Sequence, residues 1–261
     1  MESPNENEPV FTARELLAYR RAAGTLSEFP SPRAVIFAPQ KSLASYVLRK
    51  HATKQIKGFL GEFYVLKRTQ GEIAISTGFG IGAPVVAGLA DEFAALGVKQ
   101  FALIGMAGAL QPDLKTGSLV ISIGAIRGEG VSRHYLPPAD SSSHFAAHHV
   151  ESSKEMAEGV SHILTKQNCP HSSGLTWTTD APFRELRKDV LSYQNQGVLA
   201  VDMEAAALLA VAKANGLPAL AAFSIADTLA NGAWSMSSDL RPAQLGLTTL
   251  FESVLEYLLS L

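Results

Sequence analysis

The chain contains one cysteine, Cys169, among its 261 residues. One cysteine excludes a disulfide framework within the chain and disfavours a cysteine-based zinc site, so we expect a reducing compartment. The chain also lacks an apolar run of roughly 18 residues, the length that spans a bilayer. The nearest candidate, residues 203–226, is interrupted by Lys213, Asn215 and Pro218. We therefore expect a cytoplasmic protein with no membrane partner.

The net charge is also small, −2, because the chain has 22 lysines and arginines and 24 aspartates and glutamates. This balance gives no general attraction to nucleic acid, so we expect no nucleic-acid partner, and an anionic ligand would need a local positive site. The 47% hydrophobic residues indicate a globular protein with a large core. The acidic, polar start MESPNENEPV is no secretory signal. We expect residues 1–9 to form a flexible tail and residues 10–261 a single domain.

Strand-like and helix-like segments alternate along the chain. A capping box, Thr12 with Glu15, opens the first predicted helix, and Ser152 with Glu155 forms a second box before another. The helices are predicted at residues 12–23, 42–50, 84–96, 155–166, 203–215 and 242–259. The strands are predicted at residues 34–38, 62–68, 72–77, 101–105, 118–126, 174–178, 198–201 and 219–225. This alternation predicts an α/β fold with a mostly parallel sheet covered on both faces.

Sites in such folds form at the carboxyl ends of strands. At one strand end, Asp202 and Glu204 flank Met203 just before an apolar helix. Two interpretations stay open here. The carboxylates could cap the helix, whose N-terminus favours negative charge. Alternatively, a carboxylate could accept both hydroxyls of a ribose while the thioether packs on the apolar face of the sugar.

The next strand ends in Ser224-Ile225-Ala226-Asp227. Asp227 could simply begin a turn. It could also protonate a departing nucleobase, because glycosidic cleavage passes through an oxocarbenium-like state and a purine leaves more easily once its N7 carries a proton. The residues alone do not choose between these roles.

The glycine-rich stretch 78–82 suggests a phosphate held by backbone amides, with Gly80 as a candidate. It lacks the ending of a Walker sequence and the spacing of a dinucleotide fingerprint, so a tight strand–helix turn is the alternative. His144 and His148 lie four residues apart, but the sequence indicates no third ligand, and we expect no metal. Serine hydrolase chemistry has no support, because the Gly-x-Ser-x-Gly elbow is missing.

Taken together, several ordered segments resemble the nucleoside phosphorylase family, which includes uridine phosphorylases and hexameric purine nucleoside phosphorylases. The matching segments are IGMAGALQP at 104–112, GSLV at 117–120, RGEGVSRHYLP at 127–137, TTDAPFRE at 178–185, VDMEAAA at 201–207 and SIAD at 224–227. Each is modest alone, but their ordered combination is specific. The resemblance implies a three-layer α/β/α sandwich around a mixed, partly barrel-like central sheet.

The resemblance also implies an activity: a pentosyltransferase of nucleotide salvage that cleaves uridine or a purine nucleoside with phosphate, giving free base and ribose 1-phosphate. Inorganic phosphate would be the co-substrate and no other cofactor is implied. Members assemble as homodimers or homohexamers. By resemblance Glu204 binds the ribose hydroxyls, Met203 packs on the sugar, and Asp202 is a neighbouring acidic position in the substrate site.

The remaining substrate residues also follow from the resemblance. Gly108 resembles a backbone wall for the base, Phe183 stacks on base or sugar, and Asp227 is similar to the general acid of the purine-specific branch. Met106 belongs to the same pocket, although the family normally has a hydroxyl residue there. The uridine branch usually carries another residue type at the Asp227 position, so the nucleobase stays open.

The phosphate site departs most from the family. Its loop of type Gly-Asp-Pro-x-Arg is replaced by APQKS at 38–42, and Leu103 stands where a second arginine is usual. Lys41, Arg127 and Gly80 remain as phosphate candidates, although lysine lacks the planar fork of arginine. Two alternatives follow: a nucleoside hydrolase that uses water, although hydrolases of this superfamily place a glutamate at that loop, or a non-catalytic nucleoside-binding or storage protein.

Overall fold

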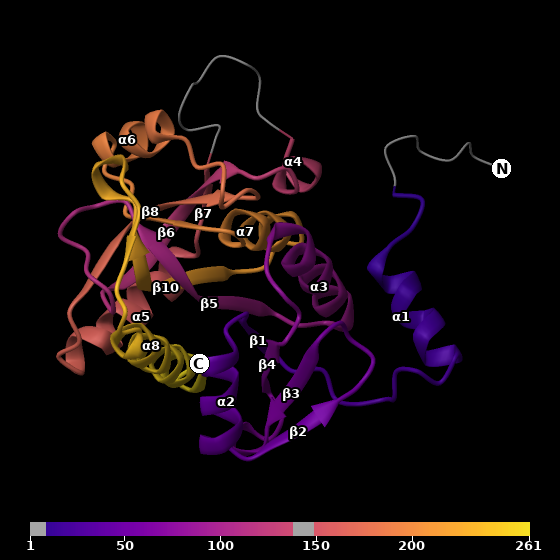
Figure 1. Cartoon of the computed structure of the whole chain (residues 1–261). Helices are drawn as coiled ribbons and strands as arrows, with labels where there is room; N and C mark the ends of the chain where they lie inside the picture. Colours follow the sequence, from indigo (N-terminus) through magenta and orange to yellow (C-terminus); the bar gives the residue numbers. More distant parts are fainter. Residues whose placement is uncertain (1–8, 138–148) are drawn as a thin grey trace.

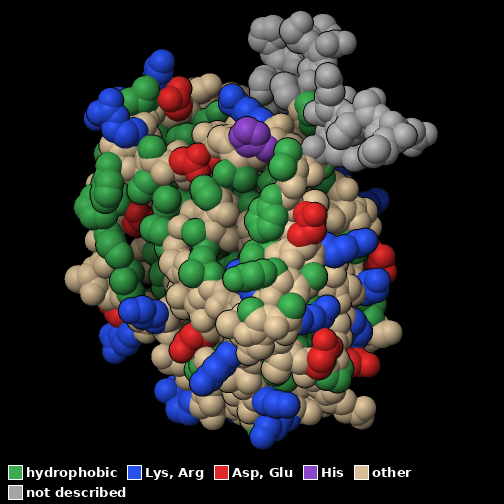
Figure 2. Space-filling model, turned by 90° about the vertical axis from the view of Figure 1, so that its right-hand side faces the viewer, with side chains coloured by type: hydrophobic (Ala, Val, Ile, Leu, Met, Phe, Trp, Pro, Cys, Tyr) green, Lys and Arg blue, Asp and Glu red, His purple; other side chains and the backbone are tan. Residues whose placement is uncertain are grey.

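The computed structural model describes residues 9–137 and 149–261 (Figure 1). The expected tail at residues 1–9 therefore lies almost entirely outside the described residues, as do His144 and His148. Within the described part, no helix combines the length and the apolar character that crossing a membrane requires. On the face shown in Figure 2, lysines and arginines are interspersed with acidic side chains rather than gathered into one positive patch.

One sheet runs through the molecule. Its strands are β1 (Ala34–Ala38), β2 (Thr53–Ile56), β3 (Glu62–Leu66), β4 (Ile73–Thr77), β5 (Gln100–Ala109), β6 (Leu119–Gly128), β7 (His149–Glu151), β8 (His171–Thr179), β9 (Ala200–Asp202), β10 (Ala219–Thr228) and β11 (Ser235–Met236). The order is β11-β10-β6-β8-β9-β5-β1-β4-β3-β2, with β7 on β6. Because β10 also pairs with β5, strands β5, β10, β6, β8 and β9 close into a ring. The partly barrel-like sheet is thus confirmed.

The expectation of a mostly parallel sheet is wrong. The pairs β1–β4, β1–β5, β5–β10, β6–β8 and β8–β9 are parallel. The pairs β2–β3, β3–β4, β5–β9, β6–β7, β6–β10 and β10–β11 are antiparallel. Several of the antiparallel partners are short strands, which carry too few residues to show a hydrophobic pattern.

Helices cover the sheet on two sides, which gives the three layers. They are α1 (Ala13–Ala22), α2 (Lys41–Lys50), α3 (Ala83–Leu96), α4 (Ser132–Tyr135), α5 (Lys154–Lys166), α6 (Arg187–Asn195), α7 (Ala205–Ala214) and α8 (Arg241–Leu259). One core joins buried side chains of α3 and α7 to the sheet, including Phe93 and Leu208. A second core joins α2, α5 and α8, including Leu43 and Phe251. Figure 1 shows α3 and α7 together and α2 beside α8.

Local chemistry sets most helix ends. Thr12 caps α1 through the predicted box, its Oγ1 accepting the Glu15 N–H at 3.3 Å. The second box is wrong by one residue, because Ser153 is the residue that caps α5 and accepts the Met156 N–H at 3.3 Å. Ser152 donates instead to the Ser122 carbonyl of β6 at 2.6 Å. The edge pairing of β7 with β6 thus draws that serine to the sheet.

The strand ends that carry the predicted site converge at β5. In the sheet, Gly108 of β5 pairs with Val201 of β9 on one side and with Asp227 of β10 on the other. Three segments that are far apart in the sequence therefore meet at one edge of the ring. This register places Asp202–Glu204 and Asp227 around the same opening.

Candidate active site

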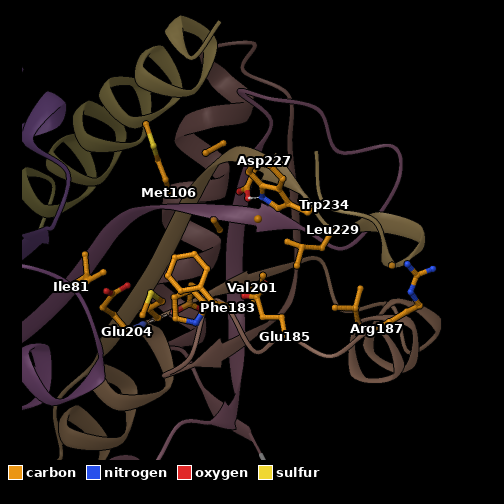
Figure 3. Close-up of a pocket in the computed structure, with 18 of the residues that line it drawn as sticks. Ile81, Met106, Phe183, Glu185, Arg187, Val201, Glu204, Asp227, Leu229 and Trp234 are labelled. Carbon is orange, nitrogen blue, oxygen red and sulfur yellow. Dashed lines mark hydrogen bonds between the residues drawn. The ribbon is translucent and has the colours of Figure 1, made fainter. Parts of the chain in front are cut away.

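A pocket of about 750 Å³ opens at these strand ends, a volume that suits a small-molecule ligand. All seven residues predicted for the acid and the substrate line it, namely Met106, Gly108, Phe183, Asp202, Met203, Glu204 and Asp227 (Figure 3). Its rim is apolar and open, since the side chains of Phe183, Trp234 and Ile81 are 97%, 66% and 62% exposed. One concave site thus gathers residues from separate segments of the chain.

Glu204 is the buried carboxylate of the pocket. It stands at the N-cap of α7, is 6% exposed, and its Oε1 accepts the backbone N–H of Gly82 at 2.6 Å. Burial raises the pKa of Glu204, and the bond from Gly82 partly opposes that rise. Gly82 has φ +105°, a conformation that favours glycine. The glycine-rich stretch 78–82 is therefore a tight turn whose last amide serves a carboxylate.

Asp202, at the end of β9, accepts hydrogen bonds from backbone N–H groups at the start of α7. Its Oδ1 accepts the N–H groups of Glu204 and Ala205, both at 2.7 Å, and Thr178 donates to Oδ2 at 3.1 Å. Burial raises the pKa of Asp202 to about 7. This geometry matches the capping interpretation: Asp202 holds the start of α7 and so places the peptide that carries Glu204.

The other side of the pocket is formed by Asp227, half-buried at the end of β10. Its Oδ2 accepts the indole N–H of Trp234 at 2.6 Å. A methyl group on Gly108 would stand 2.6 Å from Cδ1 of Leu229 and 3.3 Å from Oδ1 of Asp227. A side chain at residue 108 would therefore push Leu229 aside and crowd the carboxyl group.

The lining also includes residues that sequence reasoning did not assign to the site, among them Glu185, Arg187 and Trp234. Burial, and then the charge of Asp227, raise the pKa of Glu185 to about 7. Glu185 lies inside the TTDAPFRE segment and was available as a signal, whereas Arg187 and Trp234 follow no pattern. Figure 3 shows Arg187 at the opposite end of the pocket from Glu204 and Ile81.

The phosphate candidates Lys41, Arg127 and Gly80 are not among the residues that line the pocket. Arg127 is engaged locally, donating to Ser132 Oγ at 2.9 Å and to the Leu136 carbonyl at 2.5 Å. Lys41 is an exposed residue that begins α2. None of the three therefore lines the pocket, although Lys41 and Gly80 are the chain neighbours of Gln40 and Ile81, which do.

Among the described residues that line the pocket, Arg187 is the one basic side chain. Gln40 and Met106 also line the pocket, and the Oε1 atom of Gln40 is buried without a hydrogen-bond partner in the described part of the chain. Leu103, at the position of a family arginine, is fully buried in the core on the α3 side. Over residues 9–137 and 149–261 the structure also contains no cluster of three His, Cys, Asp or Glu side chains that could hold a metal.

In sequence, the chain is similar to several nucleoside phosphorylases. The chain is 29% identical over 160 residues to guanosine phosphorylase of Halorubrum lacusprofundi, covering 59% of this chain and 60% of that protein. It is 27% identical over 156 residues to uridine phosphorylase of Escherichia coli, covering 57% and 61%. The matched part thus spans about three fifths of the length of these relatives. A DeoD-type purine nucleoside phosphorylase of Caldanaerobacter subterraneus is 29% identical over 182 residues, covering 67% and 70%.

Among solved structures, the fold is similar to that of futalosine hydrolase of Helicobacter pylori, with a TM-score of 0.70. The superposition covers 87% of this chain and 98% of that one at 18% sequence identity. A family model described as the phosphorylase superfamily matches residues 35–258, which include every strand end of the pocket. The chain therefore belongs to the phosphorylase superfamily.

Proposed function

We propose that this protein cleaves the N-glycosidic bond of a nucleoside. The observation that carries the proposal is the placement of Glu204 and Asp227 around one pocket, with Gly108 of β5 in the wall beside Asp227. A sugar at Glu204 and a base at Asp227 would put the bond between them in the middle of the pocket. A buried carboxylate for the sugar and a carboxyl acid for the leaving base are the two groups that this reaction needs.

Glu204 is the sugar ligand in this proposal. A carboxylate offers about four acceptor sites, so the bond from Gly82 leaves room for the 2′- and 3′-hydroxyls of a ribose. Negative charge beside the sugar also stabilises the positive charge that develops at C1′ in an oxocarbenium-like transition state. Met203, the neighbour of Glu204 in the chain, and Met106 both line the pocket and offer thioethers to the apolar face of the sugar.

Asp227 is the general acid. It donates a proton to the departing base as the C1′–N bond breaks, and a purine suits this role because its N7 accepts that proton. A purine nucleoside is therefore the substrate that the site favours. Phe183, which is fully exposed at the rim, can cover the base once it is bound.

The nucleophile proposed is water. A phosphate dianion needs charge-assisted partners, and among the described residues that line the pocket Arg187 is the one lysine or arginine. Arg187 lies at the far end (Figure 3). In the balanced step, water adds its oxygen to C1′, Asp227 supplies the proton on the base, and a water proton restores Asp227. Free base and free ribose are the products.

Phosphorolysis is the second candidate, and the relatives favour it. The guanosine, uridine and purine nucleoside enzymes with which this chain aligns are all named phosphorylases. In that case phosphate would take the place of water and the product would be ribose 1-phosphate. The substitutions at Leu103 and Met106 predict a weak affinity for phosphate in that reaction.

One experiment separates these possibilities. The protein is incubated with purine and pyrimidine nucleosides, with and without phosphate, and both base and sugar products are measured by chromatography. We expect base release at the same rate in both buffers, with free ribose as the sugar product. Release that requires phosphate and yields ribose 1-phosphate would show that the nucleophile is phosphate and not water. Calorimetric binding without any release would instead identify a nucleoside-binding protein and refute the proposal of an enzyme.

A further inference from the structure

Trp234 donates a hydrogen bond to the proposed acid, Asp227, and a short hairpin of β10 and β11 brings the two side chains together. Strand β11 returns against β10 with Asp227 opposite Met236 and Thr228 opposite Ser235. This return brings the indole of Trp234 to Asp227, whose Oδ2 accepts the N–H at 2.6 Å, as the dashed line in Figure 3 shows. The side chain is 66% exposed and lines the pocket, so packing alone does not explain its position.

The bond distinguishes the two oxygens of the carboxyl group. An indole nitrogen can only donate a hydrogen bond, so Oδ2 must act as the acceptor. When Asp227 is protonated, its proton is therefore placed on Oδ1. That oxygen is the one directed toward Gly108, because a methyl group on Gly108 would lie 3.3 Å from it. Gly108 itself lines the substrate pocket.

Asp227 also lies between two cavities. Besides the substrate pocket, it lines a second cavity of about 510 Å³ whose wall includes Lys115, Asn231 and Met236. Trp234 lines the substrate pocket but not this second cavity. A hydrogen bond to Trp234 therefore holds the carboxyl group on the substrate side and opposes its rotation toward the other cavity.

We propose that Trp234 is a positioning residue: it fixes the orientation of Asp227 so that Oδ1 carries the proton delivered to the nucleobase. This inference rests on the proposed function, because it requires Asp227 to be the acid. It assigns to an exposed residue of the β10–β11 hairpin a role in the chemical step. The sugar end at Glu204 is not involved.

The test compares Trp234→Phe with Trp177→Phe. Phenylalanine keeps an aromatic ring but removes the N–H donor. Trp177 is the matched control, because it is the other tryptophan of the chain and its indole nitrogen is buried without a partner in the described structure. We expect Trp234→Phe to lower kcat by about 10- to 100-fold with KM changed less than about threefold, as for a misplaced acid. Trp177→Phe should leave kcat within about threefold of wild type.

An NMR measurement supplies a readout that does not depend on activity. The two indole N–H signals are recorded in wild-type protein, and the Trp234 signal is identified by its loss in Trp234→Phe. We expect Asp227→Ala to move the Trp234 signal upfield and to leave the Trp177 signal in place. An unmoved Trp234 signal would show that the bond is absent and would overturn the inference.

The kinetic outcomes separate the two proposals. A wild-type protein that releases no base refutes the proposed function and this inference with it. An active wild type whose kcat is unchanged in Trp234→Phe overturns the positioning role alone. The positioning role is also overturned if Trp234→Phe raises only KM, because the indole would then be a binding surface rather than a support for the acid.

Discussion

Replacing Glu204 by glutamine probes the sugar end of the pocket with little change in shape. Glutamine can still accept the Gly82 N–H that Oε1 accepts in the wild type at 2.6 Å. It removes only the negative charge from a site that is 6% exposed. Because burial raises the pKa of Glu204, a neutral side chain should be tolerated there, and we expect no fall in the thermal unfolding midpoint.

The size of the kinetic effect follows from the hydrogen bonds that lose their charge. A bond to a charged acceptor contributes about 1.5–3 kcal/mol and a neutral one about 0.5–1.5 kcal/mol. Two ribose hydroxyls at Glu204 would therefore lose about 2–3 kcal/mol together. This corresponds to a decrease of about 30- to 150-fold in kcat/KM for a ribonucleoside.

The assay measures kcat/KM for a ribonucleoside and its 2′-deoxy analogue with wild type and Glu204→Gln. We expect wild type to prefer the ribonucleoside by about tenfold or more, and the variant to reduce that preference to about threefold or less. Glu129→Gln is the matched control, since Glu129 is 2% exposed, accepts the Val131 N–H at 2.6 Å and does not line the pocket. Equal sugar preference in wild type and Glu204→Gln would refute the assignment of Glu204 to the ribose.

Three further predictions concern other residues of the site. Asp227→Asn should lower kcat for purine nucleosides by about 100-fold or more and affect pyrimidine nucleosides much less; equal losses in a rate comparison would argue against the acid role. Burial raises the pKa of Asp202 from 3.8 to about 7, so between these pH values the folded state binds a proton that the unfolded state has lost. The stabilisation that this proton gives is complete below pH 3.8 and is lost as the pH rises through 7. The free energy of unfolding from urea titrations should thus fall by up to about 1.4 kcal/mol per pH unit in that range, and Asp202→Asn should flatten the slope; an unchanged slope would contradict the burial of this carboxyl group. Gly108→Ala should displace Leu229, destabilise the fold by about 1–3 kcal/mol and lower kcat. Thermal melts and kinetics together would detect these changes, and wild-type values in both would exclude close packing at this position.

Much of the fold could be predicted from local chemistry. The Thr12 capping box, and Gly97 with φ +102° after α3, mark helix ends that depend on neighbouring residues only. The ring closure could not be derived from the strand pattern, because the pairing of β10 with β5 joins segments about 120 residues apart. The family resemblance implied it instead. Helix α6 was missed, since Val190 is the one residue of its sequence that is buried and no apolar stripe reveals it.

The residues of the site, too, could be predicted only in part. The strand-end rule predicted Asp202–Glu204 and Asp227, because the sheet itself brings carboxyl ends of neighbouring strands together. Met106 and Gly108 were implied by the family resemblance. Glu185, Arg187 and Trp234 lie beyond strand ends, where the path of the chain depends on tertiary contacts. Trp234 reaches Asp227 only through the two-residue pairing of β11, which a sequence pattern cannot show.

A crystal structure of the protein with a bound purine nucleoside, or with the base and ribose it yields, tests the central claim most directly. We expect the ribose hydroxyls to lie within hydrogen-bond distance of Glu204 and the five-membered ring of the purine to face Asp227 Oδ1 beside Gly108. A nucleoside bound with its base at Glu204, or outside this pocket altogether, would contradict these assignments of Glu204 and Asp227.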